Sequence, residues 1–240
     1  MAYEDTNYLH NKVIEVLERQ PKGRLLDLGS GVGNLARRAQ GMGFAVTACD
    51  AESGQFKYKH EIEFRQGDLN QGLPFGEEAF DCVVMLEVVE HLENPYFAFK
   101  EISRVLKAEA RLILSTPNIM NLRSRMRFLF EGTFDFFREP TLEMARKDPV
   151  FGRHIFPCRF QELEYILFSN NLSIAGIYTD LYLPNARCLS FLLPLIKLQF
   201  FLKRKRSQRK HGPDYLSLHK ALLSAELLYG RHLIIEAVKN

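Results

Sequence analysis

The sequence predicts an α/β domain in which a parallel sheet is covered by helices on both faces. Three observations support this fold class. Short apolar runs alternate with helix-prone segments from residue 20 to residue 117, the run at 80–86 is apolar almost throughout, and the length of 240 residues suits one such domain. Alternation of strands and helices is typical of doubly wound sheets, and strands covered on both faces lack a polar side.

The first half of the chain is expected to form two helices and four strands of this fold. Apolar side chains at helical spacing predict a helix over residues 8–20, which Pro21 and Gly23 end. Apolar runs bounded by polar or glycine-containing turns predict buried strands. The expected strands are residues 24–28, 44–50, 62–65 and 80–86, and a further helix is expected at 35–40.

The second half completes a sheet of seven strands. Asn94 and Pro95 open a helix that runs to Leu106, since proline suits the first turn of a helix. The remaining strands are expected at 110–114, 172–178 and 233–238. Segments 118–160 and 181–230 are rich in Leu, Phe and Arg and lack strand alternation. We expect them to form a helical cap for substrate recognition on a single domain, 1–240, with its core at 20–117.

The charge of the chain is unevenly distributed. The formal net charge is +3, but residues 203–210 (KRKRSQRK) hold six basic groups and no acid, so the other 232 residues carry −3. A mildly acidic body therefore carries one dense cationic segment.

Cysteine usage and the N-terminus exclude several classes of protein. Cys49, Cys82, Cys158 and Cys188 form no C-x-x-C pair, which excludes a zinc ribbon or a thioredoxin-type site, and we expect Cys49 and Cys82 to be buried thiols. The N-terminus lacks the features of a secretory signal, so we expect a cytoplasmic protein. The most apolar window, residues 188–202, falls short of a ~30 Å hydrocarbon core at ~1.5 Å per residue.

A glycine-rich turn follows the first expected strand. Gly29, Gly31 and Gly33 stand at alternate positions after Asp27. Glycines let a ligand approach the backbone closely, and the helix that follows offers free N–H groups. Position 34 is Asn, so the G-x-G-x-x-G spacing of dinucleotide-binding dehydrogenases is absent.

This turn resembles motif I of the class I S-adenosylmethionine-dependent methyltransferases. Three further features fit that family, over about residues 20–117. They are Asp50 at the end of the second strand, Asp68 after the third strand, and the sequence of the fourth strand. The resemblance implies a Rossmann-like seven-stranded methyltransferase sheet and S-adenosylmethionine as cofactor. It implies that Asp50 accepts hydrogen bonds from the ribose hydroxyls and that Asp68 meets the adenine amino group. The cofactor-binding residues implied are Asp27, Gly29, Ser30, Gly31, Gly33, Asp50, Asp68, Leu69 and Glu87.

Glu87, Glu90 and His91 follow the fourth strand, where methyl donor and acceptor meet in this fold. Residues three and four apart share one face of a helical turn, so His91 is a candidate general base oriented by Glu90 or Glu87. The alternative is that Glu90 and His91 cap a helix and lie in solvent.

A divalent metal is a second interpretation of these residues. The E-x-x-E-H pattern is similar to that of ubiquinone-pathway O-methyltransferases and of small-RNA 3′-terminal 2′-O-methyltransferases. That resemblance implies a site of Glu87, Glu90, His91 and a later His154, which would suit Mn²⁺, Fe²⁺ or Zn²⁺ better than Mg²⁺. The same pair occurs in methyltransferases without a metal, so both interpretations stay open.

Residues 189–210 combine long apolar side chains with the basic run. Such a segment is typical of an interfacial helix on an anionic membrane. The alternatives are a solvated loop between cap helices and a nucleic-acid contact, and the absence of aromatic residues in 203–210 disfavours the latter.

These features predict a methyltransferase acting on oxygen of an amphiphilic or lipid-linked small molecule, cytoplasmic or peripheral on the inner face of a membrane. The alternatives are a soluble metabolite, a sugar or an RNA 2′-hydroxyl as acceptor, or a non-catalytic S-adenosylmethionine-binding protein.

Overall fold

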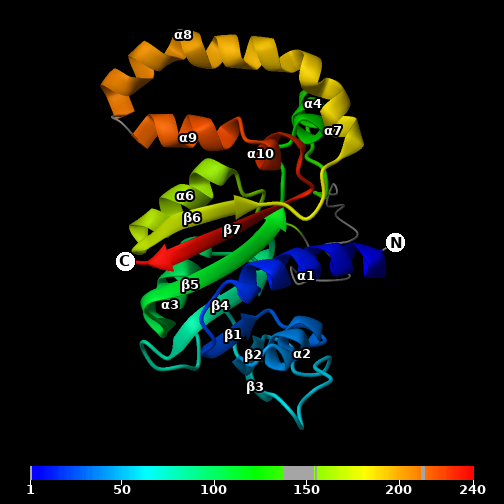
Figure 1. Cartoon of the computed structure of the whole chain (residues 1–240), viewed down its shortest axis with the longest axis vertical. Coiled ribbons are helices and arrows are strands. Elements are labelled where there is room, and N and C mark those ends of the chain that lie inside the picture. Colours follow the sequence, from blue (N-terminus) through cyan, green and yellow to red (C-terminus); the bar gives the residue numbers. More distant parts are fainter. Residues whose placement is uncertain (1, 138–153, 155, 212–213) are drawn as a thin grey trace.

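The computed structural model describes residues 2–137, 154, 156–211 and 214–240, and the side chains within these ranges except 2–6, 203–211 and 214–217. Seven strands form one sheet in the order β3-β2-β1-β4-β5-β7-β6 (Figure 1). Their bounds are β1 Arg24–Leu28, β2 Ala45–Asp50, β3 Glu63–Gln66, β4 Phe80–Leu86, β5 Leu106–Pro117, β6 Leu172–Tyr178 and β7 His232–Lys239. All seven expected strands are therefore present.

The sheet is mixed rather than wholly parallel. β1 to β5 pair in parallel, but β7 lies antiparallel between β5 and β6. The expectation of a parallel sheet was wrong for this strand, because the hydrophobic pattern of a buried strand is the same in either direction. The reversal places the first residue of β7 at the sheet edge where β4 and β5 end.

Helices cover both faces of the sheet. α1 (Ala2–Glu18) and α2 (Asn34–Gly41) pack on one face, and α3 (Pro95–Val105) and α6 (Phe160–Ser169) pack on the other. Successive side chains of a strand point to opposite faces. Leu25 and Val84 accordingly enter the core beneath α1 and α2, while Leu26 and Val83 enter the core beneath α3 and α6.

Two helix expectations are confirmed in detail. The Asn94 side chain accepts a hydrogen bond from the backbone N–H of Phe97, and Pro95 occupies the first turn of α3. No α-helix lies between β2 and β3 or between β3 and β4, where the structure describes every residue. This side of the sheet is thinly covered, as the short polar connections predict.

The remaining helices form the cap. They are α4 (Leu122–Glu131), α7 (Pro184–Cys188), a 3₁₀ turn η2 (Leu189–Leu192), α8 (Leu193–His211), α9 (Asp214–Leu222) and α10 (Ala225–Tyr229). α8 and α9 form a hairpin beyond the β6 edge of the sheet (Figure 1). The basic run 203–210 lies within α8, so the alternative of a solvated loop there was wrong.

The apolar part of the cap is longer than its sequence indicates. Helical structure begins at Pro184, four residues before the apolar window, and continues without a break into α8. By length and composition alone, Pro184–Leu202 could cross a membrane, with a mean hydropathy of 1.2 and 6% of it buried. The expectation that this segment is too short rested on residues 188–202 and is corrected in that respect.

Candidate active site

The glycine turn joins β1 to α2 in a conformation that glycine favours. Gly29, Gly31 and Gly33 have φ values of +69°, +50° and +89°, in the left-handed region where a side chain costs energy. A Cβ at Gly29 would lie 2.3 Å from Val88 Cγ2, and a Cβ at Gly33 would lie 2.5 Å from the Phe56 ring. The first and third glycines are thus required for packing, while the space beside Gly31 is open.

A cavity of about 410 Å³ opens beside this turn. Five of the nine sequence-predicted cofactor residues lie in its wall: Gly29, Asp50, Asp68, Leu69 and Glu87. They come from the carboxyl ends of β1 to β4, which is where ligands bind in open α/β sheets. His91 also lines the cavity, so the candidate base and the candidate cofactor residues share one space.

Asp27 has a place beneath the turn rather than in the cavity wall. Its carboxyl group is buried and accepts a hydrogen bond from the backbone N–H of Ala36 in α2. Burial, together with the charge of Asp50, raises the pKa of Asp27 to about 7, although the Ala36 hydrogen bond opposes the shift. In this structure Asp27 ties the turn to α2.

Asp50 and Asp68 are ordered by local hydrogen bonds. Asp50 Oδ2 accepts from the N–H of Gly31 at 2.8 Å, and its Oδ1 accepts from the N–H of Glu52 at 3.0 Å. Asp68 Oδ1 accepts from the N–H of Asn70 at 2.9 Å. A carboxylate oxygen has two acceptor positions, so both acids keep capacity for ligand hydroxyl or amino groups.

These residues fit an adenosine-containing cofactor. The fixed acids Asp68 and Asp50 lie after β3 and β2, and the glycine turn after β1 gives close access to the backbone. The Ser30 hydroxyl is buried without a hydrogen-bond partner among the described residues, which leaves a polar atom for a ligand at this turn.

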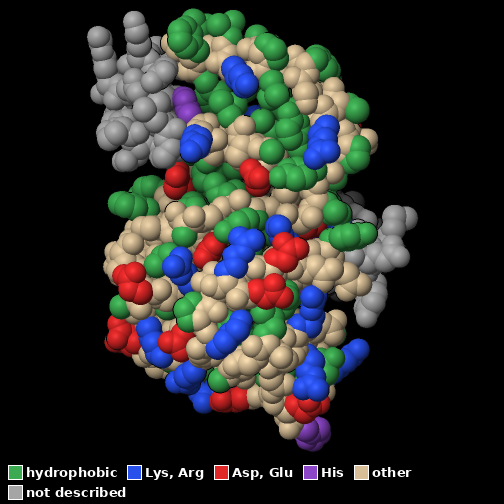
Figure 2. Space-filling model, viewed as in Figure 1, with side chains coloured by type: hydrophobic (Ala, Val, Ile, Leu, Met, Phe, Trp, Pro, Cys, Tyr) green, Lys and Arg blue, Asp and Glu red, His purple; other side chains and the backbone are tan. Residues whose placement is uncertain are grey.

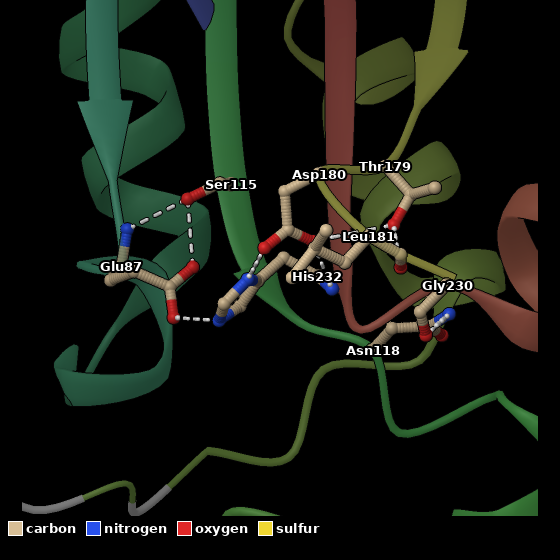
Figure 3. Close-up of polar contacts among 8 residues, drawn as sticks. All are labelled: Glu87, Ser115, Asn118, Thr179, Asp180, Leu181, Gly230 and His232. Carbon is tan, nitrogen blue, oxygen red and sulfur yellow. Dashed lines mark hydrogen bonds and ion pairs between the residues drawn. The ribbon is translucent and has the colours of Figure 1, made fainter. Parts of the chain in front are cut away.

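The predicted catalytic residues take different positions after β4. Glu87 has a φ of +55°, and only Val89–His91 form a helical turn, the 3₁₀ helix η1. Glu87, Glu90 and His91 therefore do not share one helical face. Glu87 instead turns toward β5 and β7, where Ser115 Oγ donates to its Oε1 at 2.7 Å (Figure 3).

Glu90 is 0% exposed and is not among the residues that line the cavity. Thr116 Oγ1 donates to Glu90 Oε2 at 3.1 Å. Burial and the nearby charge of Glu87 raise the pKa of Glu90 well above its usual value. The alternative in which Glu90 caps a helix in solvent was wrong.

His91, His154 and Glu90 converge. One ligand atom of each lies within 4.8 Å of the others, and the two imidazole rings meet edge to face with centroids 4.9 Å apart. Burial and the nearby His91 ring lower the pKa of His154. Glu87 is not part of this group, so three of the four predicted metal ligands come together.

Several residues that line or support the site were not singled out by the sequence. Ser115 and Thr116 follow the expected strand 110–114 and lie within β5, just as site residues follow the second, third and fourth strands. His232 and Asp180 carried no local signal, because the antiparallel pairing of β7 is what brings them to Glu87.

Residues 26–114 match the family model described as a methyltransferase domain. The chain is 30% identical over 127 residues to a ubiquinone biosynthesis O-methyltransferase of Caulobacter sp. (strain K31), covering 47% of this chain and 50% of that protein. It is 31% identical over 159 residues to the protein of the same name from Ruegeria pomeroyi, covering 54% of this chain and 64% of that protein. The chain thus matches about half the length of these curated relatives.

A solved structure of a SAM-dependent methyltransferase from Archaeoglobus fulgidus superposes with a TM-score of 0.59 at 17% identity, covering 96% of this chain and 94% of that one. At this identity the likeness shows the fold, and it extends beyond the region of sequence similarity. Three observations point to the same fold. They are the match of residues 26–114, the order of the seven strands and the glycine turn. Residues 26–114 therefore match a methyltransferase domain, and the chain as a whole has the fold of a SAM-dependent methyltransferase.

Proposed function

We propose that this protein transfers a methyl group from S-adenosylmethionine to an oxygen atom of an amphiphilic or lipid-linked small molecule. One observation carries the proposal. The cavity lined by Gly29, Asp50 and Asp68 is also lined by His91, so cofactor-binding groups and a proton acceptor lie in one space. The names of the curated relatives support oxygen as the methylated atom.

The residues of this chain bind, orient and accept a proton. The cofactor supplies a sulfonium-activated methyl group, so alignment of the acceptor can provide much of the rate enhancement. Asp68 and Asp50 bind the adenosine part, and the glycine turn accommodates the methionine part. His91 accepts the proton of the acceptor hydroxyl as its oxygen attacks, since imidazole is the usual proton acceptor near neutral pH.

A second role for the same residues is metal binding. Glu90 Oε1 and His154 Nδ1 are buried without a hydrogen-bond partner among the described residues, and both lie beside His91. One carboxylate and two imidazoles suit Zn²⁺, Mn²⁺ or Fe²⁺, which would hold the acceptor hydroxyl as a Lewis acid. Metal analysis of the purified protein, and turnover before and after chelation, separate the two roles. Full activity without metal supports His91 as the base.

The cap has an exposed apolar stripe that fits a membrane surface. Phe191, Leu195, Leu198 and Leu202 recur at spacings of four, three and four residues, and between 52% and 72% of each is exposed. Such spacing places them on one face of a helix. Figure 2 shows hydrophobic side chains gathered over the cap. The basic run 203–210 follows directly in the same helix, and each Lys or Arg near an anionic leaflet contributes about 1 kcal/mol.

The partner that complements this surface is an anionic lipid bilayer, and the protein would then be cytoplasmic and peripheral. Vesicle sedimentation with phosphatidylcholine, alone and with phosphatidylglycerol, tests the proposal. Binding should require the anionic lipid and weaken in Leu195→Ser/Leu198→Ser, but not in Phe168→Ser, an equally exposed apolar residue on α6. Equal binding to both vesicles, or a dimer in sedimentation velocity that the double variant abolishes, would contradict it.

Methyl transfer itself is tested with labelled cofactor. The protein is incubated with S-adenosylmethionine carrying a labelled methyl group and a lysate, and the products are partitioned between organic and aqueous phases. Label in the organic phase supports a lipid-linked acceptor. Label confined to the aqueous phase supports a soluble metabolite, a sugar or RNA, and cofactor binding without any transfer supports a non-catalytic binding protein.

A further inference from the structure

A buried histidine at the start of β7 lies outside the residues that the sequence singled out. His232 has 8% of its side chain exposed and sits opposite Pro117 in the antiparallel pair of β5 and β7. β7 is antiparallel to β5, so the first residue of β7 lies beside the carboxyl ends of β5 and β4. This arrangement brings the imidazole to Glu87 (Figure 3).

Asp180, which follows β6, fixes the orientation of this ring. The Asp180 side chain is 0% exposed, and its Oδ2 lies 2.8 Å from His232 Nδ1. Its Oδ1 accepts from the backbone N–H of His232 at 3.1 Å. A carboxylate can only accept hydrogen bonds, so Nδ1 carries a proton and Nε2 is the nitrogen that faces Glu87. The Phe136 ring stacks on the imidazole with centroids 5.9 Å apart.

Glu87 is held by two strands at once. Nε2 of His232 lies 3.5 Å from Glu87 Oε2, while Ser115 Oγ binds Oε1. The backbone of Glu87, at a φ of +55°, is in a region that costs energy for a residue with a side chain. Each carboxylate oxygen thus has its own partner, and the carboxylate has one orientation at the cavity wall.

The position of Glu87 along the sheet indicates which part of the cofactor it meets. Asp68, Asp50, Gly29 and Glu87 follow β3, β2, β1 and β4, which are consecutive neighbours in the sheet. If the adenosine part lies at Asp68 and Asp50, the methionine part reaches Gly29 and Glu87. That part carries a sulfonium and an ammonium group, and a fixed carboxylate complements either cation.

We propose that His232 is a positioning residue: held by Asp180, it fixes the Glu87 carboxylate toward the cationic end of S-adenosylmethionine. This inference rests on the proposed function, because it assigns support for the same site. Burial lowers the pKa of His232, but the carboxylates of Glu87 and Asp180 outweigh that effect and raise it above its ordinary value. The two carboxylates therefore favour the charged imidazole, in which Nε2 carries a proton directed at Glu87.

Two substitutions at His232 separate the contact of Nδ1 with Asp180 from the ion pair of Nε2 with Glu87. The amide nitrogen of Gln can take the place of Nε2, while that of Asn can take the place of Nδ1. His232→Asn should therefore weaken S-adenosylmethionine binding on the order of tenfold in titration calorimetry, the effect of one charge-assisted hydrogen bond. His232→Gln should retain affinity to within about threefold, a difference below ~0.7 kcal/mol. His10→Asn, the same exchange on α1, is the matched control and should leave affinity unchanged.

Equal losses in the Asn and Gln variants would overturn the inference, because a general packing role does not distinguish the two nitrogens. A second measurement covers misfolding of the Asn variant. In a Glu87→Gln background, His232→Asn and wild-type His232 should bind the cofactor equally, since the carboxylate to be positioned is gone, and unequal binding would overturn the inference. If the wild type itself does not bind S-adenosylmethionine, the proposed function fails first.

Discussion

The contact between Gly29 and Val88 yields a prediction that can be worked from the structure. Gly29→Ala places a methyl group at φ +69° and 2.3 Å from Val88 Cγ2. The left-handed conformation costs roughly 1–2 kcal/mol for a residue with a Cβ. Overpacking of a tight contact adds roughly 1–3 kcal/mol. We expect the free energy of unfolding to fall by about 2–5 kcal/mol.

Gly31→Ala is the matched control for this change. Gly31 also has a positive φ, of +50°, but a Cβ there has no neighbour within 4 Å. It should therefore show only the backbone cost of roughly 1–2 kcal/mol. Urea unfolding followed by circular dichroism measures both free energies, and the same preparations serve for cofactor titrations.

A double variant isolates the steric part. Val88→Ala removes the Cγ2 that the new methyl group would meet, so Gly29→Ala should cost less in that background by the overpacking part, about 1–3 kcal/mol. The reasoning is refuted if Gly29→Ala is no more destabilising than Gly31→Ala, or if its cost is the same in the wild-type and Val88→Ala backgrounds.

Three further predictions concern charged groups. The pKa of Asp27 is raised to about 7, so the folded state holds a proton that the unfolded chain releases near pH 4; stability should fall as pH rises from 4 to 7. Asp27→Asn should remove this loss, of roughly 4 kcal/mol by the size of the shift, and a parallel pH dependence in both proteins would contradict it. His91→Ala should cut turnover while cofactor affinity stays nearly unchanged, and equal losses in both would sink the assignment of His91 as base. Burial lowers the pKa of Arg125, and its Nε has no hydrogen-bond partner among the described residues. Arg125→Met should raise the free energy of unfolding by about 1–3 kcal/mol in urea melts, whereas a loss of stability would show that the guanidinium is paired.

The cofactor half of the site was predictable because its signals are local. Each acid or glycine follows directly on an apolar run, so the position in sequence gives the position in the sheet. The carboxyl ends of parallel strands meet at one edge, which is why Gly29, Asp50, Asp68 and Glu87 could be expected together. These four residues lie in one cavity wall because β3, β2, β1 and β4 are consecutive neighbours in the sheet.

The acceptor half was predicted less well because its contacts join distant segments. Glu90 was expected either to orient His91 or to cap a helix in solvent, and packing of η1 against β5 buries it next to Thr116. For the basic run, the sequence left both an interfacial segment and a solvated loop open, because a hydrophilic segment has no apolar face that would indicate a helix. The basic run continues α8, which extends the apolar stretch that precedes it.

The sequence by itself determined the positions of the strands along the first half of the chain, the glycine turn and the acids that follow the strands, since each depends on a few consecutive residues. It also determined the division of charge between an acidic body and a basic segment. Only the tertiary structure decided that β7 is antiparallel to β5, because a strand buried on both faces has the same hydrophobic pattern in either direction. That reversal joins Asp180 and His232 to Glu87 and supplies the support that no local pattern could reveal.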